Sequence, residues 1–336
     1  HTYPELTNEI NINSGGISTD AAIYTDSKDF SKYTVMYEVK GKVLYEKLPF
    51  VLEMMYEIIY ETKFEDEKRL REIIARIKSR MESNMTGSGH TVAMLSAMAQ
   101  FSPSSYYSDI LRGYQYYEFI EKADRDFDSM KEMLAENLKR TAALIFTKEN
   151  LTVSFTAEDD GLELLQKPMT EFVAKLARLQ EKDAVRTFRP VKEKTAYTSS
   201  SQVQYVARCG NYRKAGYEYT GALKVLKIIF SYDYLWLNVR VKGGAYGCMS
   251  GFYRNGDTYM VSYRDPNLAE TNTIFEQAAE YVRRFDVSER DMVKFIIGTI
   301  GGMDTPMNPA SKGVRSFGAY ICHTEYAPVS YTHLRA

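Results

Sequence analysis

A predicted helix gives way to a predicted strand across Val239-Arg240-Val241-Lys242-Gly243-Gly244-Ala245-Tyr246-Gly247. The paired glycines let the backbone turn sharply, because glycine reaches conformations that other residues avoid. Beyond them, alternating apolar and polar positions predict two strands, over residues 246–253 and 258–264. Asn255-Gly256 lies between these strands and favours a tight turn with positive φ angles. The pattern therefore predicts a β-hairpin directly after the glycines.

The same landmarks occur near the start of the chain. Gly15-Gly16 precedes Gly243-Gly244 by 228 positions, and the strand pattern at 33–37 precedes its counterpart at 259–263 by 226. Two amphipathic helices are predicted after each strand, over 44–60 and 70–81 in the first copy and over 271–285 and 288–300 in the second. The repeated order indicates a duplicated unit. The expected fold class is α+β, with two tandem homologous domains, each an antiparallel-rich sheet packed by helices.

The domain boundary is expected in the polar segment 181–201, which contains Pro190 and a run of serines. Residues 1–190 are therefore assigned to the first domain and residues 191–328 to the second. Residues 329–336 do not continue the helical pattern, and we interpret them as a non-native tail.

Each copy has segments that the other lacks. A strand over 203–209 and two helices precede the glycines of the second copy, whereas only fourteen residues precede those of the first. Conversely, the first copy continues through a strand over 151–157 and a helix over 162–179, which have no counterpart after the second. This comparison predicts that the sequence is incomplete at both termini.

The composition argues against several classes of protein. With 43 Lys and Arg against 44 Asp and Glu, the net charge is -1, so no bulk positive field favours nucleic acid or an anionic membrane. The apolar runs 225–230 and 295–300 are far shorter than the roughly 18 residues of a membrane-spanning helix. Cys209, Cys248 and Cys322 are widely spaced and odd in number, which indicates a reducing compartment, with the cytoplasm as the expected location.

Familiar catalytic motifs are absent from the sequence. The four histidines are isolated, and neither H-E-x-x-H nor H-x-x-E-H occurs, so no metal site is expected within this chain. His90 is interpreted as a loop or cap residue. The G-x-S-x-G turn of serine hydrolases and the phosphate-binding G-x-x-x-x-G-K-[ST] loop are missing as well.

The glycine turn itself carries the best candidates for chemistry. Arg240 lies in the last turn of the predicted helix, and Tyr246 begins the next strand, so both side chains can converge on one cleft. A guanidinium and a phenol are suitable donors to a peptide carbonyl, or to the negative charge that develops on it during hydrolysis. The alternative is an arginine placed favourably at a helix C-terminus beside an ordinary strand tyrosine. Spacing alone leaves both interpretations open.

Three segments resemble the insulinase-type (M16) zinc peptidases, specifically subfamily C, the presequence-protease subfamily. They are Thr7-Asn8-Glu9-Ile10 with Ser14-Gly15-Gly16-Ile17-Ser18, then residues 239–247 quoted above, and Ser262-Tyr263-Arg264-Asp265-Pro266-Asn267. The resemblance covers about residues 1–327. Members of this family carry four related α+β domains in two halves that close around an unfolded peptide, and this chain would supply the third and fourth.

The resemblance also implies a division of labour. The N-terminal half of such an enzyme holds Zn2+ through H-x-x-E-H, while the C-terminal half contributes an Arg and a Tyr, which match Arg240 and Tyr246. Gly243, Gly244 and Ala245 are expected to bind substrate beside them. The expected partners are that N-terminal half of the same polypeptide and an unfolded peptide. Without the zinc motif, this chain alone is expected to be inactive.

Two functions remain open at this point, because a third, an unrelated α+β binding module, would require the paired motifs to be coincidental. The first is the substrate-clamping half of a zinc metalloendopeptidase that degrades unstructured peptides in a closed chamber. The second is a non-catalytic, peptidase-like subunit with a structural or peptide-binding role. Retention of both Arg240 and Tyr246 favours the enzyme. If the source is eukaryotic, an organelle matrix replaces the cytoplasm as the expected location.

Overall fold

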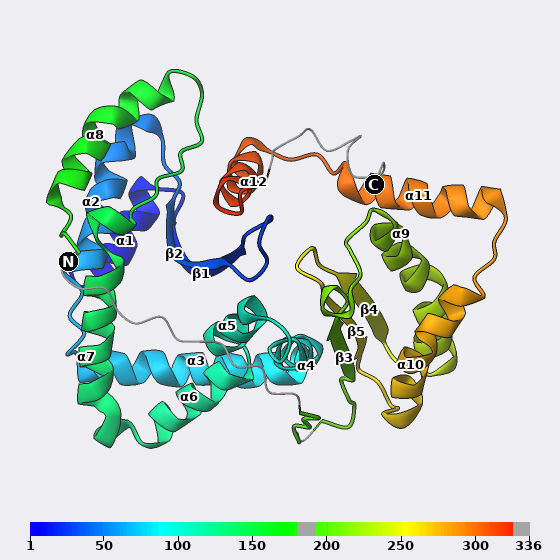
Figure 1. The fold of residues 1–336 in the computed structure, drawn as a ribbon. Coiled ribbons are helices and arrows are strands. Elements are labelled where there is room, and N and C mark those ends of the chain that lie inside the picture. The colour runs from blue at the N-terminus through cyan, green and yellow to red at the C-terminus, as the bar shows by residue number, and fades with distance from the viewer. Residues whose placement is uncertain (180–192, 200, 325–336) are drawn as a thin grey trace.

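The computed structural model of the chain describes residues 1–179, 193–199 and 201–324 (Figure 1). Helices dominate, and the strands form two small antiparallel sheets. We call residues 1–179 the first part and residues 201–324 the second part. No helix among these described residues is long and apolar enough to cross a membrane.

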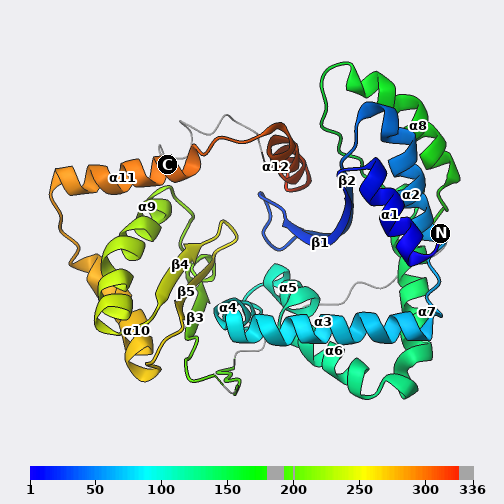
Figure 2. The ribbon, with the colours of Figure 1, turned by 180° about the vertical axis from the view of Figure 1, so that it is seen from behind.

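The first part consists of a β-hairpin with helices around it (Figures 1 and 2). The hairpin pairs β1 (Ile17–Thr25) with β2 (Tyr33–Gly41). The helices are α1 (Tyr3–Asn13), α2 (Leu48–Tyr60), α3 (Glu67–Gly87), α4 (Gly89–Met98), α5 (Pro103–Arg112), α6 (Tyr114–Arg125), α7 (Phe127–Ile145) and α8 (Gly161–Lys175). Short 3-10 turns occupy Tyr45–Lys47 and Lys148–Asn150.

Two apolar clusters hold α2, α3, α6, α7 and α8 in place. Helices α3, α6 and α7 share one cluster, whose buried members are Ile74, Ile120, Ala123, Phe127 and Leu134. Helices α2 and α8 share the other, which buries Val51, Leu52, Phe172 and Leu176. The helical periodicity predicted over 70–81 is the face of α3 that meets the first cluster, so that prediction is confirmed.

The second part contains a three-stranded antiparallel sheet in the order β3-β5-β4. Its strands are β3 (Ala207–Asn211), β4 (Gly247–Phe252) and β5 (Asp257–Tyr263). Its helices are α9 (Ala222–Ile229), α10 (Ala269–Arg283), α11 (Glu289–Met303) and α12 (Pro309–Ile321). After α9 the helix continues in π-helical form through Phe230–Tyr234 and Trp236–Lys242, and a 3-10 turn occupies Arg213–Ala215.

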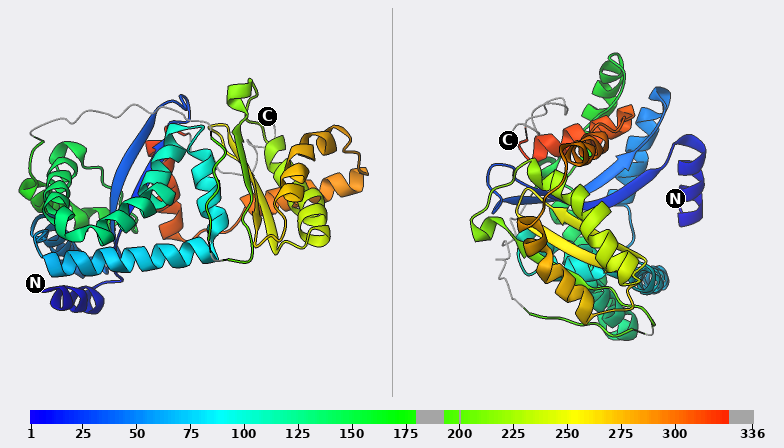
Figure 3. Two further views of the ribbon diagram at one scale, coloured as in Figure 1. Left: turned by 90° about the horizontal axis from the view of Figure 1, so that it is seen from below. Right: turned by 90° about the vertical axis from the view of Figure 1, so that its right-hand side faces the viewer.

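Both faces of this sheet are covered, but by different parts of the chain. The π-helical segment and α10 bury one face in a cluster that includes Phe230, Leu235, Val239 and Phe275. Helix α4 of the first part packs against β3 and β5 on the other face. The left view of Figure 3 shows the sheet between the helices of the two parts. Helices of both parts therefore pack against this one sheet.

The chain returns to the first part at its described C-terminal end. Helix α12 lies near the β1–β2 hairpin, with the Tyr24 and Phe317 ring centroids 6.0 Å apart (Figure 2). The Ser27 amide donates to the Cys322 carbonyl at 2.8 Å. The two parts thus contact each other through α12 as well as through α4.

The two hairpins have matching register. The corresponding pairs are Ala21↔Tyr37 and Gly247↔Tyr263, followed by Thr25↔Tyr33 and Gly251↔Tyr259. Both strands of the second hairpin therefore lie 226 positions after those of the first, and the two-residue difference falls between the glycines and the first strand. The second glycine of each pair has a positive φ, 104° at Gly16 and 78° at Gly244. This shared geometry is what a duplicated unit would show.

Several details differ from the sequence expectations. The sheet of the first part has two strands, and residues 151–157 are not a strand because no described segment pairs with them. Only Gly256 has a positive φ in the β4–β5 turn, so the connection is a three-residue loop ending in a glycine bulge rather than a primed two-residue turn. The predicted domain boundary at 190/191 and the predicted tail 329–336 lie outside the described residues.

Candidate functional site

The π-helical segment Trp236–Lys242 ends in an unusual turn. The Gly243 amide donates to the Asn238 carbonyl at 3.0 Å, a bond that spans five residues, and the Ala245 amide donates to the Val239 carbonyl at 3.1 Å. A Cβ at Gly243 would lie 2.6 Å from the Val239 carbonyl oxygen, so the position requires glycine. The next residue, Gly244, supplies the left-handed conformation that turns the chain into β4. π-Helical geometry often occurs at functional sites.

This turn brings Arg240 and Tyr246 together, as the spacing predicts. The Arg240 guanidinium donates to the Tyr246 carbonyl oxygen, and its carbon lies 5.5 Å from the centre of the Tyr246 ring. The Tyr246 side chain is 65% exposed, whereas the intervening Ala245 is 3% exposed. The protein therefore anchors the backbone of this turn in its core while it presents a phenol and a guanidinium at the surface.

A second aromatic ring lies close to the guanidinium. The Arg240 guanidinium carbon is 4.4 Å from the centre of the Trp236 ring, one turn earlier on the same helix. Sequence reasoning missed this contact. The spacing of Trp236 and Arg240, four residues apart, is the signal that could have revealed it.

The motif Ser262–Asn267 supports the same turn from the neighbouring strand. The Tyr246 amide donates to the Arg264 carbonyl at 3.2 Å, and the Asn267 side-chain amide donates to the Gly243 carbonyl at 2.5 Å. Arg264 adopts an uncommon positive φ of 47°. Asp265 is fully buried and accepts hydrogen bonds from the Asn267 amide and the Thr271 hydroxyl, which fixes the loop. The two most specific stretches of the resemblance thus form one structural unit.

The backbone of Gly243, Gly244 and Ala245 is already engaged. Each of the three amides donates to a carbonyl of the preceding helix, at Asn238, Arg240 and Val239 respectively. These amides are therefore not available as donors to a peptide in this conformation. The substrate-binding role expected for the three residues stays a prediction.

His90 lies behind the tyrosine pair. The Tyr246 and Tyr263 ring centroids are 5.7 Å apart in a T-shaped contact, and the His90 ring meets Tyr263 edge-on at 4.9 Å. The His90 Nδ1 atom is buried, and it has no hydrogen-bond partner in the described part of the chain. Burial lowers the pKa of His90, which favours the neutral ring. The imidazole thus packs α4 against the sheet beneath the candidate site.

Other nucleophiles and ligands are scarce around this turn. Burial raises the pKa of the Cys248 thiol to about 11, so the thiol is protonated at neutral pH. Within residues 1–179, 193–199 and 201–324, no three His, Cys, Asp or Glu side chains gather closely enough to hold a metal ion. In the same residues Arg240 makes no ion pair, so no carboxylate neutralises its charge. The arrangement can donate hydrogen bonds and stabilise negative charge, but it carries no nucleophile of its own.

Comparisons with known proteins give consistent matches along the chain. Residues 1–122 match the family model for the region associated with M16 peptidases of subfamily C, and residues 194–329 match "PreP C-terminal domain". The chain is 34% identical over 329 residues to Protein HypA of Clostridium perfringens, covering 97% of this chain and 33% of that protein. It is 28% identical over 320 residues to Presequence protease 1, chloroplastic/mitochondrial, of Arabidopsis thaliana, covering 94% of this chain and 29% of that protein. The chain therefore spans about a third of the length of these curated relatives.

Solved structures share the fold at low sequence identity. The inactive M16 peptidase domain of Pseudomonas fluorescens superposes with a TM-score of 0.55 at 15% identity, covering 99% of this chain and 76% of that one. Pitrilysin superposes with a TM-score of 0.54 at 12% identity, covering 94% of this chain and 32% of that one. The two family matches, the relatives and the fold agree with one another and with the resemblance at the glycine turn. The chain belongs to the M16 peptidase family, in its branch of presequence-protease-like proteins.

Proposed function

We propose that this chain is the substrate-clamping C-terminal half of a zinc-dependent metalloendopeptidase that degrades unstructured peptides in a closed chamber. The single observation that carries the proposal is the meeting of Arg240 and Tyr246 at the end of the π-helical segment, with the phenol largely exposed. The names of the relatives, which include presequence proteases, support a peptidase role. The partners under this proposal are an unfolded peptide and the N-terminal half of the same polypeptide.

Under this proposal the zinc ligands belong to the N-terminal half of the intact polypeptide, as the resemblance to the M16 peptidases implies. There the metal would supply the activated water for hydrolysis. The residues of this chain would act on the peptide carbonyl. Arg240 would donate a charge-assisted hydrogen bond to the carbonyl oxygen in the bound state, and the Tyr246 hydroxyl would donate to the same oxygen as negative charge develops on it.

The location of the intact protein is part of the proposal as well. The Arabidopsis thaliana relative is named as chloroplastic/mitochondrial, and a presequence protease of Xenopus tropicalis is named as mitochondrial. We propose a cytoplasmic location for a bacterial source and an organelle matrix for a eukaryotic one.

Tyr246→Phe in the intact zinc-loaded polypeptide tests the proposal. Loss of one transition-state donor is expected to lower kcat by roughly tenfold to a thousandfold with little change in KM. The readout is the hydrolysis of an internally quenched, unstructured peptide, with zinc content measured on the same samples and expected to stay unchanged. Tyr320→Phe, which removes the hydroxyl of an exposed tyrosine on α12, is the matched control and should retain full activity.

Two results would contradict the proposal. If Tyr246→Phe keeps its kcat but melts at a lower temperature, Tyr246 is a packing residue. If the intact polypeptide binds the peptide without cleaving it, the non-catalytic, peptide-binding alternative replaces the enzyme.

A further inference from the structure

Trp236 is the single tryptophan of the chain. It lies on the outer side of the π-helical segment with 41% of its surface exposed, while Leu235 and Val239 of the same segment are fully buried. An indole that remains this exposed contributes less to burial of apolar surface than a core residue does. Its position therefore calls for an explanation other than packing in the core.

The indole is one of two aromatic rings that lie close to the Arg240 guanidinium. The Arg240 guanidinium carbon is 4.4 Å from the Trp236 ring centre and 5.5 Å from the Tyr246 ring centre. A guanidinium within about 6 Å of an aromatic face is attracted by the electron-rich ring, and tryptophan is the strongest partner of this kind. Two ring contacts and the hydrogen bond to the Tyr246 carbonyl together restrict an otherwise flexible side chain.

Restraint by rings differs chemically from restraint by a carboxylate. A carboxylate binds the N–H groups at the edge of a guanidinium and neutralises its charge. Aromatic rings contact the faces of the guanidinium and leave the N–H edge for another acceptor. Because no described residue makes an ion pair with Arg240, its remaining N–H groups keep both their charge and their capacity to bind a carbonyl.

We propose that Trp236 is a positioning residue for the peptidase reaction, which holds the Arg240 guanidinium by its face so that the N–H edge meets the carbonyl of the bound peptide. This inference rests on the proposed function. It adds a residue that acts through Arg240 and does not itself touch the reacting atoms.

Substitutions of Trp236 in the intact zinc-loaded polypeptide test the role. Trp236→Leu keeps an apolar side chain but removes the ring, and it is expected to lower kcat/KM by roughly 2- to 30-fold for an internally quenched, unstructured peptide. Trp236→Phe retains an aromatic face and should recover most of the loss. Tyr232→Leu removes an exposed ring from the preceding turn, against which no cation of the described chain is stacked, so it is the matched control and should leave kcat/KM unchanged.

Chemical rescue of Arg240→Ala distinguishes a positioning role of Trp236 from a merely structural one, because a structural role would not make the rescue depend on Trp236. Free guanidinium at millimolar concentration should restore part of the activity of Arg240→Ala, since both rings that attract the cation remain in that variant. The same addition should fail in the double variant Trp236→Leu with Arg240→Ala. Equal rescue in both variants would overturn the positioning role.

The two proposals fail in different ways. If Arg240→Ala is impaired while Trp236→Leu matches wild type, the positioning role is wrong and the proposed function stands. If Arg240→Ala itself has the wild-type kcat/KM, the proposed function fails and the positioning role fails with it. If the Trp236→Leu protein unfolds below the assay temperature, Trp236→Phe and Trp236→Tyr are measured instead. For the inference to hold, the kcat/KM of both must then remain close to that of wild type.

Discussion

At the scale of single residues, Gly243 is the position that shapes the site. A Cβ there would lie 2.6 Å from the Val239 carbonyl and 3.0 Å from the Asn238 carbonyl, and both carbonyls accept hydrogen bonds from the turn. Neither oxygen can move away without breaking those bonds. The backbone, and not the substrate, therefore dictates glycine at this position.

Gly243→Ala is predicted to lower the free energy of unfolding by about 1–3 kcal/mol through this steric conflict. Gly301→Ala is the matched control, because Gly301 lies in α11 and a Cβ there meets nothing within 4 Å. In the Gly301→Ala variant the free energy of unfolding should rise by up to about 1 kcal/mol, because alanine has a better helix propensity than glycine. Chemical denaturation of both variants decides the matter, and equal stabilities would contradict the steric argument.

The sequence predicts some contacts of this site and misses others for a physical reason. Arg240 and Tyr246 are six residues apart across a glycine turn, so the chain itself forces them close together. The four-residue spacing of Trp236 and Arg240 allows their contact, but whether the contact forms depends on π-helical hydrogen bonding and on side-chain rotamers, which the spacing does not specify. The contact of His90 with Tyr263 joins residues that are far apart in the chain, and no local pattern predicts it.

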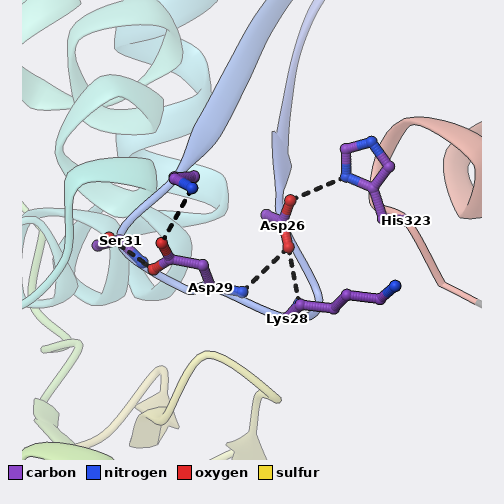
Figure 4. Close-up of polar contacts among 6 residues, drawn as sticks. Asp26, Lys28, Asp29, Ser31 and His323 are labelled. Atoms are coloured by element: carbon purple, nitrogen blue, oxygen red, sulfur yellow. Dashed lines mark hydrogen bonds and ion pairs between the residues drawn. The ribbon is translucent and has the colours of Figure 1, made fainter.

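At the scale of elements, the tip of the β1–β2 hairpin is tied to the end of α12 (Figure 4). One oxygen of Asp26 accepts from the Lys28 and Asp29 amides at 2.7 and 3.0 Å, and the other lies 2.8 Å from Nδ1 of His323. The Ser27 hydroxyl also donates to the His323 carbonyl at 2.9 Å. A single carboxylate therefore closes a turn and links two elements that are nearly three hundred residues apart in the chain.

The stability of this link should depend on pH. The backbone amides of Lys28 and Asp29, followed by His323, lower the pKa of Asp26 to about 2. The unfolded chain has an ordinary aspartate pKa of about 3.9, so the stabilisation is complete above that pH and disappears as the pH falls toward 2. Wild type should be more stable than Asp26→Asn at pH 5, and the gap between their urea midpoints should close between about pH 4 and pH 2. Asp159→Asn, an exposed control, should show no such closing gap.

A helix or strand could be predicted from its sequence where its apolar pattern packs against, or pairs with, a neighbouring element. The hairpin near residues 246–264 and the helices α2, α3, α10 and α11 follow from their patterns. Residues 151–157 alternate as a strand does yet form none, whereas β1, which has little alternation, is a strand because β2 lies beside it. Strand formation depends on a hydrogen-bonding neighbour, and the sequence of one segment does not reveal that neighbour.

At the scale of the whole molecule, a buried carboxylate joins the two parts. Asp257, which is 1% exposed, lies at the start of β5. It accepts hydrogen bonds from the Ser102 and Ser105 hydroxyls at the start of α5, and from the side chains of Asn211 and Asn255. A carboxylate of the second part thereby sits at the positive end of a helix of the first part.

Asp257→Ala is predicted to lower the free energy of unfolding by about 3 kcal/mol or more, because it leaves several buried donors without an acceptor. Ser105→Ala should lower the free energy of unfolding by less than Asp257→Ala does. The double variant Asp257→Ala with Ser105→Ala should lose less stability than the sum of the two single losses, since both substitutions break the same hydrogen bond. Ser108→Ala, also on α5 but with its hydroxyl bonded to the Ser104 carbonyl of its own helix, is the control and should change little. Strict additivity between Asp257 and Ser105 in urea denaturation would contradict the proposed link.

The organisation of the molecule was only partly visible in the sequence. Family membership and the repeated hairpin followed from local motifs, because glycine pairs and alternating strands leave a clear pattern. The packing of both parts against one sheet did not follow from local motifs, because the sequence of α4 does not show which element its apolar face will contact.

That shared sheet has a consequence for how the chain is made. On the ribosome, α4 is synthesised before β3, β4 and β5, and at about 5–20 residues per second it waits roughly 10–30 s for the last of them. During this interval the side of α4 that will contact the sheet has no cover from it. The nascent chain thus carries an unburied apolar surface while the residues from the end of α4 to the end of β5 are synthesised, and transiently exposed surface of this kind is prone to aggregate.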